Sequence, residues 1–382
     1  MQLSYTIVAF SHLRWNFVYQ RPQHLLSRLA AMHPVVFVEE PEFDAEGPAR
    51  WERSSPHPNV TVYRPRTAVA VPGFHAEQLP VLEPLMADLT AELGDVNLLA
   101  WLYTPMALPL ALALDPDAVV YDCMDELSLF LGAPPELLAF EEQLLEYADV
   151  MFTGGPSLFR AKQSRHPNVH CFPSSVDAGH FRLTRAGGNE VSEAEDQAEL
   201  PHPRLGFYGV IDERLDLDII DRLAGDHPDW QIVVVGPVVK IDPARLPRKP
   251  NIHYFGQRSY DELPRYLAGW DVCLLPFARN DATKFISPTK TLEYMAAELP
   301  IVSTPITDVA EPYGEIVYLG DTPDEFVRAC EAALASSAEE RAARTARMRE
   351  VLTGTSWEVT VSAMERLLTE AMAGRTTLRL PA

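Results

Sequence analysis

Short apolar runs alternate with amphipathic helical patterns along most of the chain. In the first half the runs predict strands at Tyr5–Phe10, Val35–Val38, Val60–Tyr63, Leu98–Tyr103, Val119–Asp122 and Val150–Thr153. Helices are expected between them at Gln23–Met32, Glu136–Tyr147 and Pro156–Arg165. Nearly continuous apolar strands that alternate with helices are typical of a mostly parallel sheet with both faces covered.

The alternation stops at residues 186–203, an acidic stretch without Lys or Arg that we interpret as a solvated linker. After it, strands are predicted at Leu205–Tyr208, Ile232–Val235, Ile252–Tyr254, Val272–Pro276 and Ile301–Thr304. Helices are predicted at Asp216–Leu223, Tyr260–Ala268, Lys290–Ala297, Asp324–Leu334 and Ala338–Val351. The expected organisation is a domain at 1–183, a linker at 184–203, a second domain at 204–355 and a final helix at 356–382.

Composition and charge narrow the class of protein. The 382 residues include 54 Asp and Glu against 32 Lys and Arg, a formal charge of −22, which argues against a general nucleic-acid-binding surface. The four cysteines are scattered, which disfavours a zinc site or a disulfide framework and fits reduced thiols in a cytoplasm. Residues 96–114 carry no charge, but two prolines interrupt them, so a buried strand, a loop and a short helix are expected there.

The segment Phe285–Pro300 carries the strongest candidate chemistry. Ser287 suits a helix N-cap and Pro288 a first helical position, which puts Lys290 in the first turn. A lysine beside free N–H groups at a helix start suits a phosphate. Glu293 shares a face with Lys290 and could accept both hydroxyls of a ribose. A capped helix with a Lys290–Glu293 surface pair is the alternative.

The run SPTKTLEYMAAELPIVST resembles the donor-binding helix of GT-B glycosyltransferases, which move a sugar from a nucleotide-sugar to an acceptor. The opening FSHLRWNFVYQRPQHLLSRLA and the segment VVYDCMDELS are similar to bacterial glycosyltransferases of the teichuronic-acid-biosynthesis type, in the family 1/4 superfamily. A more distant similarity is to the xanthan glucuronosyltransferase. The resemblance implies an α/β fold of the GT-B type, with two Rossmann-like domains facing each other across a cleft.

The resemblance also implies roles for residues of the second half. Lys290 would hold the donor pyrophosphate and Glu293 the ribose hydroxyls. The full expected donor set is Gly209 and Arg214 near the phosphates, Gln257 and Arg258 near the base, and Ser287, Thr289, Lys290 and Glu293 at the helix. Retaining relatives carry a glutamate where this chain has Phe285, so the anomeric outcome stays open.

The first half supplies a candidate base. In the xanthan-type relatives, the aspartate at the position of Asp125 is the general base, and a carboxylate there could take the proton of the acceptor hydroxyl. The alternative is that Asp122 or Asp125 caps the following helix.

The loop after the first strand is the expected acceptor site. His12, Arg14 and Trp15 would bind the acceptor, because an indole stacks on sugar rings, and Arg14 or Arg21 could meet an anionic group. The alternative is an ordinary loop with Trp15 packed in the core. The resemblance further implies that the final helix crosses back to the first domain, with Trp357 anchoring it by packing.

Metal and cofactor chemistry is not expected. The two DxD triplets, Asp115–Asp117 and Asp216–Asp218, sit at predicted element ends, where aspartates form caps and turns, so we interpret them as structural. We expect a metal-independent enzyme without a cofactor.

The resulting hypothesis is a cytoplasmic glycosyltransferase with a nucleotide-diphosphate sugar, UDP-linked, as donor and a saccharide or lipid-linked acceptor. Its place would be cell-surface polysaccharide synthesis, without nucleic acid as partner and with peripheral membrane contact left open. Two alternatives remain: a UDP-sugar 2-epimerase of the same fold, and a non-catalytic member that binds sugar nucleotides.

Overall fold

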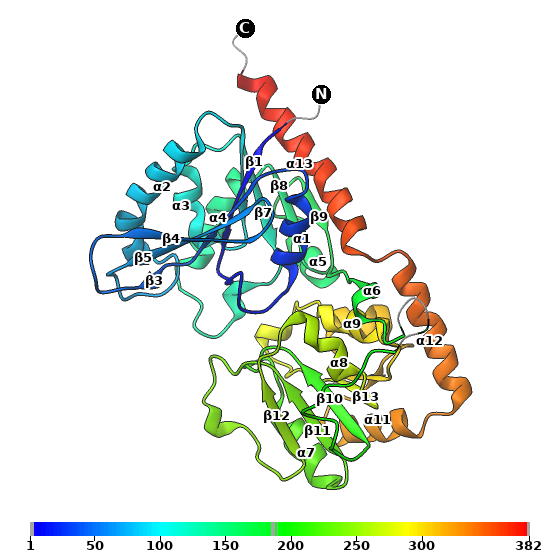
Figure 1. The fold of residues 1–382 in the computed structure, drawn as a ribbon. Coiled ribbons are helices and arrows are strands. Elements are labelled where there is room, and N and C mark those ends of the chain that lie inside the picture. Colours follow the sequence, from blue (N-terminus) through cyan, green and yellow to red (C-terminus); the bar gives the residue numbers. More distant parts are fainter. Residues whose placement is uncertain (1–3, 185–187, 189, 380–382) are drawn as a thin grey trace. The chain divides into compact units, whose positions relative to one another are not determined.

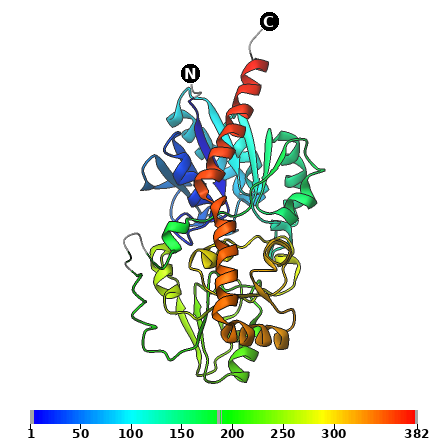
Figure 2. The same cartoon turned by 90° about the vertical axis from the view of Figure 1, so that its right-hand side faces the viewer.

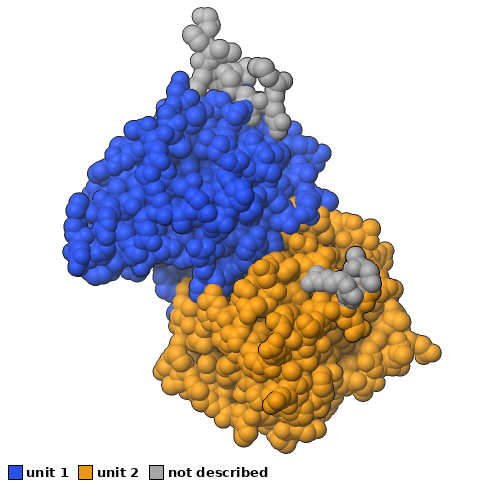
Figure 3. Space-filling view, in the orientation of Figure 1, with its two compact units in different colours: residues 1–173, 358–382 blue, residues 174–357 orange. Residues whose placement is uncertain are grey.

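The computed structural model describes residues 4–184, 188 and 190–379, with side chains up to residue 374. The chain divides into two compact units (Figure 3). Unit 1 takes the residues up to Pro173 and those from Glu358 onward, and unit 2 spans Ser174–Trp357. Each unit is built around its own largely parallel sheet (Figure 1).

The strands of unit 1 form one sheet. They are β1 (Thr6–Ser11), β2 (Val35–Glu39), β3 (Glu42–Phe43), β4 (Arg50–His57), β5 (Val60–Thr67), β6 (Leu98–Leu102), β7 (Ala118–Cys123), β8 (Val150–Thr153) and β9 (Val169–Cys171). Their order is β3-β5-β2-β1-β6-β7-β8-β9, and β4 pairs antiparallel with β5 at the edge. β1, β2, β6, β7 and β8 are buried at every position, which explains their uninterrupted apolar runs.

Helices connect the strands of unit 1. They are α1 (Arg21–Leu29), α2 (Leu79–Leu93), α3 (Leu108–Leu112), α4 (Leu137–Tyr147), α5 (Pro156–Lys162) and α13 (Trp357–Arg379), with 3₁₀ turns η1 (Ala76–Gln78), η2 (Pro105–Ala107) and η3 (Leu127–Leu129). The uncharged segment 96–114 folds into β6, η2 and α3, which confirms the prediction of a strand, a loop and a short helix. In the described part of the chain, no helix is both long and apolar enough to cross a membrane.

The final helix α13 belongs to unit 1 from Glu358 onward (Figure 2). Val361, Met364, Leu368 and Met372 are buried at helical spacing, and the Trp357 ring at the helix start is fully buried. Glu365 fixes the helix, since it accepts a hydrogen bond from the Tyr5 hydroxyl at 3.0 Å and pairs with His33 at 2.9 Å.

Unit 2 has a six-stranded parallel sheet among its described residues. Its strands are β10 (Arg204–Tyr208), β11 (Gln231–Val235), β12 (Ile252–Gly256), β13 (Val272–Leu275), β14 (Ile301–Ser303) and β15 (Tyr318–Leu319). The order is β12-β11-β10-β13-β14-β15. This is the doubly wound order 3-2-1-4-5-6. The second and third strands are added on one side of the first strand, and the fourth strand is added on its other side, so the order reverses there. The reversal lies between β10 and β13.

Helices cover both faces of the second sheet. They are α6 (Ala178–Phe181), α7 (Leu217–Asp226), α8 (Leu263–Leu267), α9 (Thr289–Ala296), α10 (Thr307–Tyr313), α11 (Pro323–Ala335) and α12 (Ala338–Thr353), with 3₁₀ turns η4 (Pro243–Arg245), η5 (Tyr260–Glu262) and η6 (Asp281–Thr283). One core cluster joins the strands to α7 and α11, and the other joins them to α8, α9 and Met348 of α12.

The acidic stretch before β10 is partly packed, which corrects the expectation of a solvated linker. Gln197 is fully buried, donates to the Tyr266 carbonyl at 2.8 Å and accepts from the Trp270 indole at 3.1 Å. Glu195, by contrast, is almost completely exposed. Acids such as Glu195 face water while residues between them pack on the domain, and composition alone does not separate the two.

The end of α9 holds a backbone conformation that disfavours its side chain. The Leu299 N–H bonds to the Tyr294 carbonyl and the Glu298 N–H to the Met295 carbonyl, which is a Schellman motif. Glu298 therefore takes the position normally occupied by glycine, with φ at 60°. Its carboxylate forms a two-point ion pair with Arg349.

We predict that Glu298→Gly is more stable than Glu298→Ala by about 1 kcal/mol, because only glycine adopts this conformation without a steric cost. Both substitutions remove the ion pair with Arg349, so their difference isolates the backbone contribution. The measurement is the free energy of unfolding in urea. Equal free energies of unfolding for the two variants would contradict a backbone strain at position 298.

Candidate active site

The reversal point of the second sheet brings Gly209 and Lys290 together. Gly209 directly follows β10, with φ at 140°, and Lys290 lies in the first turn of α9. A Cβ atom placed on Gly209 would lie 2.8 Å from the Lys290 Nζ. A side chain at position 209 would therefore displace the lysine. Ligands of doubly wound sheets bind beside this reversal, outside the carboxyl ends of the strands.

Two aromatic rings flank the Lys290 ammonium. The Nζ lies 5.6 Å from the centre of the Phe207 ring and 5.9 Å from that of Phe277. Phe207 lies in β10 and Phe277 follows β13, so the two rings come from the two strands at the reversal. The two rings restrict the position of the ammonium.

Glu293 lies one turn further along α9, in the interior of the unit. It is 6% exposed and accepts a hydrogen bond from the Tyr208 hydroxyl at 2.6 Å. Burial raises the pKa of Glu293 to about 7, although the Tyr208 hydroxyl and the charge of Lys290 both favour the ionised form. The alternative of a surface Lys290–Glu293 pair is wrong, because Glu293 is a buried carboxyl group.

The start of α9 differs by one residue from the expected helix start. Pro288, and not Ser287, is the N-cap, with an extended backbone, and the helix begins at Thr289. Ser287 and Thr289, both in the expected donor set, are linked by Ser174. The Ser174 hydroxyl donates to the Ser287 carbonyl at 3.0 Å and accepts from the Thr289 hydroxyl at 3.0 Å. Ser174 was not predicted, because its contact is distant in sequence.

Arg214 is engaged by its own loop. Its guanidinium forms a two-point ion pair with Asp212, at distances of 2.6–3.1 Å. The loop is in turn tied to the segment after β13: the Ala278 N–H bonds to the Arg214 carbonyl and the Asn280 amide to the Glu213 carbonyl, each at 2.8 Å. The two loops at the reversal point therefore form one connected structure.

The expected base-binding residues, Gln257 and Arg258, directly follow β12. Arg258 donates to the Asp196 carboxylate at 2.8 Å and to the Tyr266 hydroxyl at 2.7 Å. Gln257 is exposed just after β12. Of the expected donor set, the structure brings together Gly209, Lys290 and Glu293, with Ser287, Thr289 and Arg214 on adjoining segments.

Asp122, at the end of β7 in unit 1, is an ion-pair partner and not a helix cap. It is fully buried, and the Arg21 guanidinium contacts both of its oxygens at 2.9–3.2 Å. Arg21 also donates to the Phe172 carbonyl at 2.7 Å. The expected contact of Arg21 with an anionic ligand is thereby corrected, because its side chain is buried on these partners. The pair ties the start of α1 to the strand that leads into Asp125.

The segment that carries Asp125 is held on its other side as well. Glu126 pairs with the buried Lys162 at 2.6 Å, and Lys162 pairs with Glu141 at 2.6 Å. Gly154 packs so closely on the Met124 carbonyl that a Cβ atom there would overlap it. Asp125 itself is partly exposed. A partly exposed carboxylate on a fixed segment is suited to proton transfer.

The loop after β1 is fixed by two buried polar side chains. Glu39, fully buried, accepts from the Trp15 N–H at 2.8 Å and pairs with Arg14 at 3.3 Å. Gln23 donates to the Trp15 carbonyl at 2.8 Å. His12 is partly exposed in the same loop. The sequence analysis missed Glu39 and Gln23, whose role depends on contacts with residues outside their own segments.

The position of Trp15 corrects its expected role as a sugar-stacking residue. Its side chain is 8% exposed and packs edge-on against Phe37, with 5.1 Å between ring centres. This is the core-packed alternative, because a buried indole offers no free face to a sugar.

The DxD aspartates have structural partners. Asp216 is the N-cap of α7 and accepts from the Asp218 and Ile219 N–H groups, and Asp117 accepts from the Leu98 N–H at 2.8 Å. Asp216 thus makes the capping contact that the sequence analysis expected, whereas Asp117 ties its segment to the start of β6. Within the described ranges, no group of three or more His, Cys, Asp or Glu side chains is placed to hold a metal ion.

Comparisons with known proteins agree with the fold. Residues 202–336 match the family model described as glycosyl transferases group 1. The chain is 26% identical over 282 residues to TuaH of Bacillus subtilis (strain 168), named as a teichuronic acid biosynthesis glycosyltransferase, covering 68% of this chain and 69% of that relative.

Two solved structures extend the similarity over nearly the whole chain. Sucrose-phosphate synthase from Thermosynechococcus elongatus aligns with a TM-score of 0.73 at 15% identity, covering 97% of this chain and 100% of the other. A trehalose-6-phosphate structure from E. coli, bound with UDP-2-fluoro glucose, aligns with a TM-score of 0.68 at 13% identity, covering 95% and 99%.

Two units, each built on a largely parallel sheet, align over nearly the whole chain with sucrose-phosphate synthase, and they give the protein the GT-B fold. The protein is a glycosyltransferase with this fold, and its residues 202–336 match the group 1 glycosyl transferase model. The resemblance found in the sequence is thereby confirmed.

The buried Glu293 carboxyl predicts a pH dependence of stability. Its folded-state pKa of about 7 exceeds the ordinary value of 4.5, so between these values the folded chain holds a proton that the unfolded chain lacks. The contribution of Glu293 is fully present below pH 4.5 and is lost as the pH rises through 7. Each unit of pKa difference corresponds to about 1.4 kcal/mol.

We therefore expect Glu293→Gln to gain stability relative to the wild type as the pH rises from about 5 to about 8. The measurement is the free energy of unfolding of both proteins across this range. Glu83→Gln, at an exposed position of α2, is the control and should stay parallel to the wild type. If the free energy of unfolding of Glu293→Gln changed with pH in parallel with that of the wild type, the raised pKa of Glu293 would be contradicted.

Proposed function

We propose that this glycosyltransferase uses a nucleoside-diphosphate sugar, UDP-linked, as its donor, without a metal ion. The observation that carries the proposal is the Lys290 ammonium held over Gly209 at the reversal point of unit 2. A lysine among the free N–H groups of a helix start is a site for phosphate oxygens. The E. coli structure bound with UDP-2-fluoro glucose supports a UDP-linked donor for a protein of this fold.

The roles of the neighbouring groups follow from their chemistry. Lys290 would bind the diphosphate and stabilise the negative charge that develops on the leaving nucleotide. Glu293 would hold the ribose hydroxyls, with the Tyr208 hydroxyl fixing the orientation of its carboxyl group. Gly209 would allow the diphosphate to approach the backbone. The remaining expected residues would line the same region or the base: Ser287, Thr289, Arg214, Gln257 and Arg258.

The acceptor is proposed to be a saccharide or glycolipid of a cell-surface polysaccharide, bound by unit 1. The similarity to the teichuronic acid glycosyltransferase TuaH supports this class of product. Asp125 would accept the proton of the acceptor hydroxyl as its oxygen attacks the anomeric carbon. His12 and Arg14 would bind the acceptor, whereas the buried Trp15 would act by holding the loop.

Donor binding is the first test. At about 100 times its dissociation constant, UDP should stabilise the protein by roughly 2.7 kcal/mol, measured as a thermal shift. Lys290→Ala should abolish the shift, whereas Lys249→Ala, which removes a partly exposed lysine paired with Asp221, should retain it.

The shift should survive EDTA, because protein cations take the place of a metal ion. A shift that disappears with EDTA would contradict metal independence. A shift retained in Lys290→Ala would contradict the role of this lysine.

The general base is tested separately. Asp125→Asn should lower kcat by about 10²- to 10⁴-fold, because the amide cannot accept the proton, while the UDP-induced thermal shift stays unchanged. Asp88→Asn, at an exposed position of α2, is the matched control and should leave kcat unchanged. Turnover by Asp125→Asn at the wild-type rate would overturn the assignment.

A further inference from the structure

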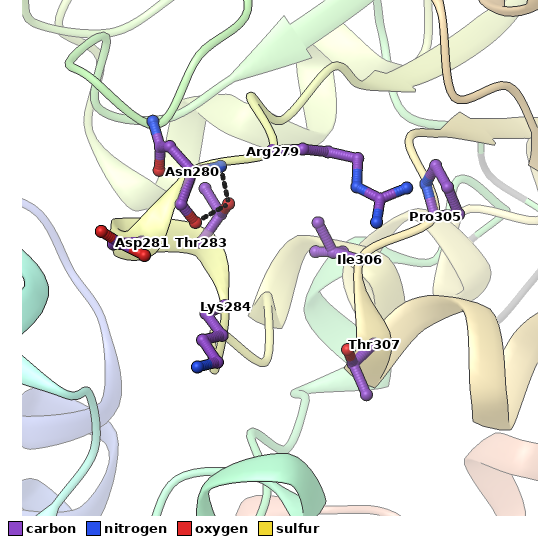
Figure 4. A pocket seen from close by; sticks show the side chains of 8 residues that line it. All are labelled: Arg279, Asn280, Asp281, Thr283, Lys284, Pro305, Ile306 and Thr307. Atoms are coloured by element: carbon purple, nitrogen blue, oxygen red, sulfur yellow. Dashed lines mark hydrogen bonds between the residues drawn. The ribbon is translucent and has the colours of Figure 1, made fainter.

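A polar pocket lies within unit 2, at the carboxyl ends of β13 and β14 (Figure 4). Its volume is about 440 Å³. Its lining comes from the loops after these strands: Arg279, Asn280, Asp281, Thr283, Lys284, Pro305, Ile306 and Thr307. The volume suits a single sugar with its water shell, and pockets for small ligands are of this size.

Six of the eight lining residues are polar, and none of the eight is aromatic. Hydroxyl, amide and charged groups at this density bind a ligand that carries many hydroxyl groups of its own, because each can exchange hydrogen bonds with water for hydrogen bonds with the ligand. The lining therefore favours a sugar over an apolar molecule.

The charges in the pocket point to an anion. Two of the charged lining residues, Arg279 and Lys284, are basic and one, Asp281, is acidic. The Arg279 guanidinium is bonded to Asp321 at 2.7 Å. Lys284 is exposed, and within the described ranges its ammonium has no carboxylate at ion-pair distance. Its Nζ lies 5.2 Å from the centre of the Phe285 ring. Lys284 is therefore the cation that can meet a ligand.

The wall that carries Lys284 is fixed before any ligand binds. The Thr283 hydroxyl donates to the Ala278 carbonyl at 2.5 Å and accepts from the Asn280 N–H at 3.2 Å. The Asn280 amide reaches the Glu213 carbonyl, in the loop that begins at Gly209. The pocket wall and the proposed diphosphate site thus share one set of hydrogen bonds.

The Lys284 and Lys290 side chains lie at different sites of unit 2. The Lys290 ammonium lies against Gly209, near the Phe207 and Phe277 rings, whereas Lys284 lines the pocket formed with the loop after β14. Figure 4 shows the Lys284 and Thr307 side chains extending on the same side of the pocket, away from Arg279. A diphosphate held by Lys290 leaves Lys284 available for a second negative group.

We propose that this pocket binds a sugar that carries a negative group, a carboxylate or a phosphate, and that Lys284 selects for that group. The inference rests on the proposed function, since the sugar is the one that the donor carries and unit 1 is proposed to bind the acceptor. It adds to that function the charge class of the sugar and the residue that recognises it.

The test measures dissociation constants by calorimetry for UDP, UDP-glucose and UDP-glucuronic acid, with the wild type, Lys284→Gln and Lys284→Arg. A separate arm adds glucose 6-phosphate or glucose to the UDP-bound protein. The first set probes a carboxylate on the donor, and the second a phosphate on a free sugar.

In the wild type one of the two anionic sugars should bind about 3- to 10-fold more tightly than its neutral counterpart, UDP-glucose or glucose. Lys284→Gln should remove this preference and leave the affinity for UDP unchanged, and Lys284→Arg should keep it. The preference should shrink at high salt, because the lysine is exposed.

The experiment distinguishes a failure of this inference from a failure of the proposed function. If UDP binds and neither anionic sugar is preferred, or the preference persists in Lys284→Gln, the inference is overturned while the donor site stands. If UDP itself does not bind the wild type, the proposed donor fails and the inference falls with it.

Discussion

The close contact between Gly209 and Lys290 is the constraint on which the candidate donor site depends. A parallel sheet brings the ends of β10 and β13 to one edge, at the point where the strand order reverses. Lys290 can lie against Gly209 there because residue 209 has no side chain. The same helix then places Glu293 one turn deeper, where the Tyr208 hydroxyl and the charge of Lys290 offset part of the cost of burying a carboxyl group.

The candidate base in unit 1 is supported in a different way. The acids on either side of it are already paired, Asp122 with Arg21 and Glu126 with Lys162, and both pairs are largely buried. Buried pairs are costly to break, so they fix the segment between them more than they add to stability. Asp125 lies between the two paired acids in sequence and is itself partly exposed. The arrangement separates the residues that hold the segment from the one proposed to exchange a proton.

The sequence predicted most of the strands and the residues of the donor helix, since buried parallel strands and helix starts leave local patterns. It missed the edge strand β4 (Arg50–His57), because its residues are mostly exposed and polar. It also missed Glu39 and Lys162, which sit in otherwise ordinary segments and become informative only when distant chain segments meet. Trp15 is the opposite case. Its residue type predicted a contact with a sugar, but in the structure its ring packs against Phe37 in the core.

The overall charge of −22 and the proposed anionic ligands are compatible because electrostatic range is short. At physiological salt, exposed charges more than about 8 Å apart are largely screened from each other. A diphosphate near α9 therefore responds to Lys290 and the helix start more than to the acids elsewhere on the chain.

The same reasoning makes Lys284 informative. The chain has many carboxylates, but among the described residues none lies at ion-pair distance from Lys284, which lines the pocket. No ion pair therefore neutralises its positive charge, and the charge can attract an anionic ligand. Recognition of an anion by an acidic protein thus depends on which few cations are placed at the strand ends. The loops after β10, β13 and β14 fix those positions, because they share hydrogen bonds or line one pocket.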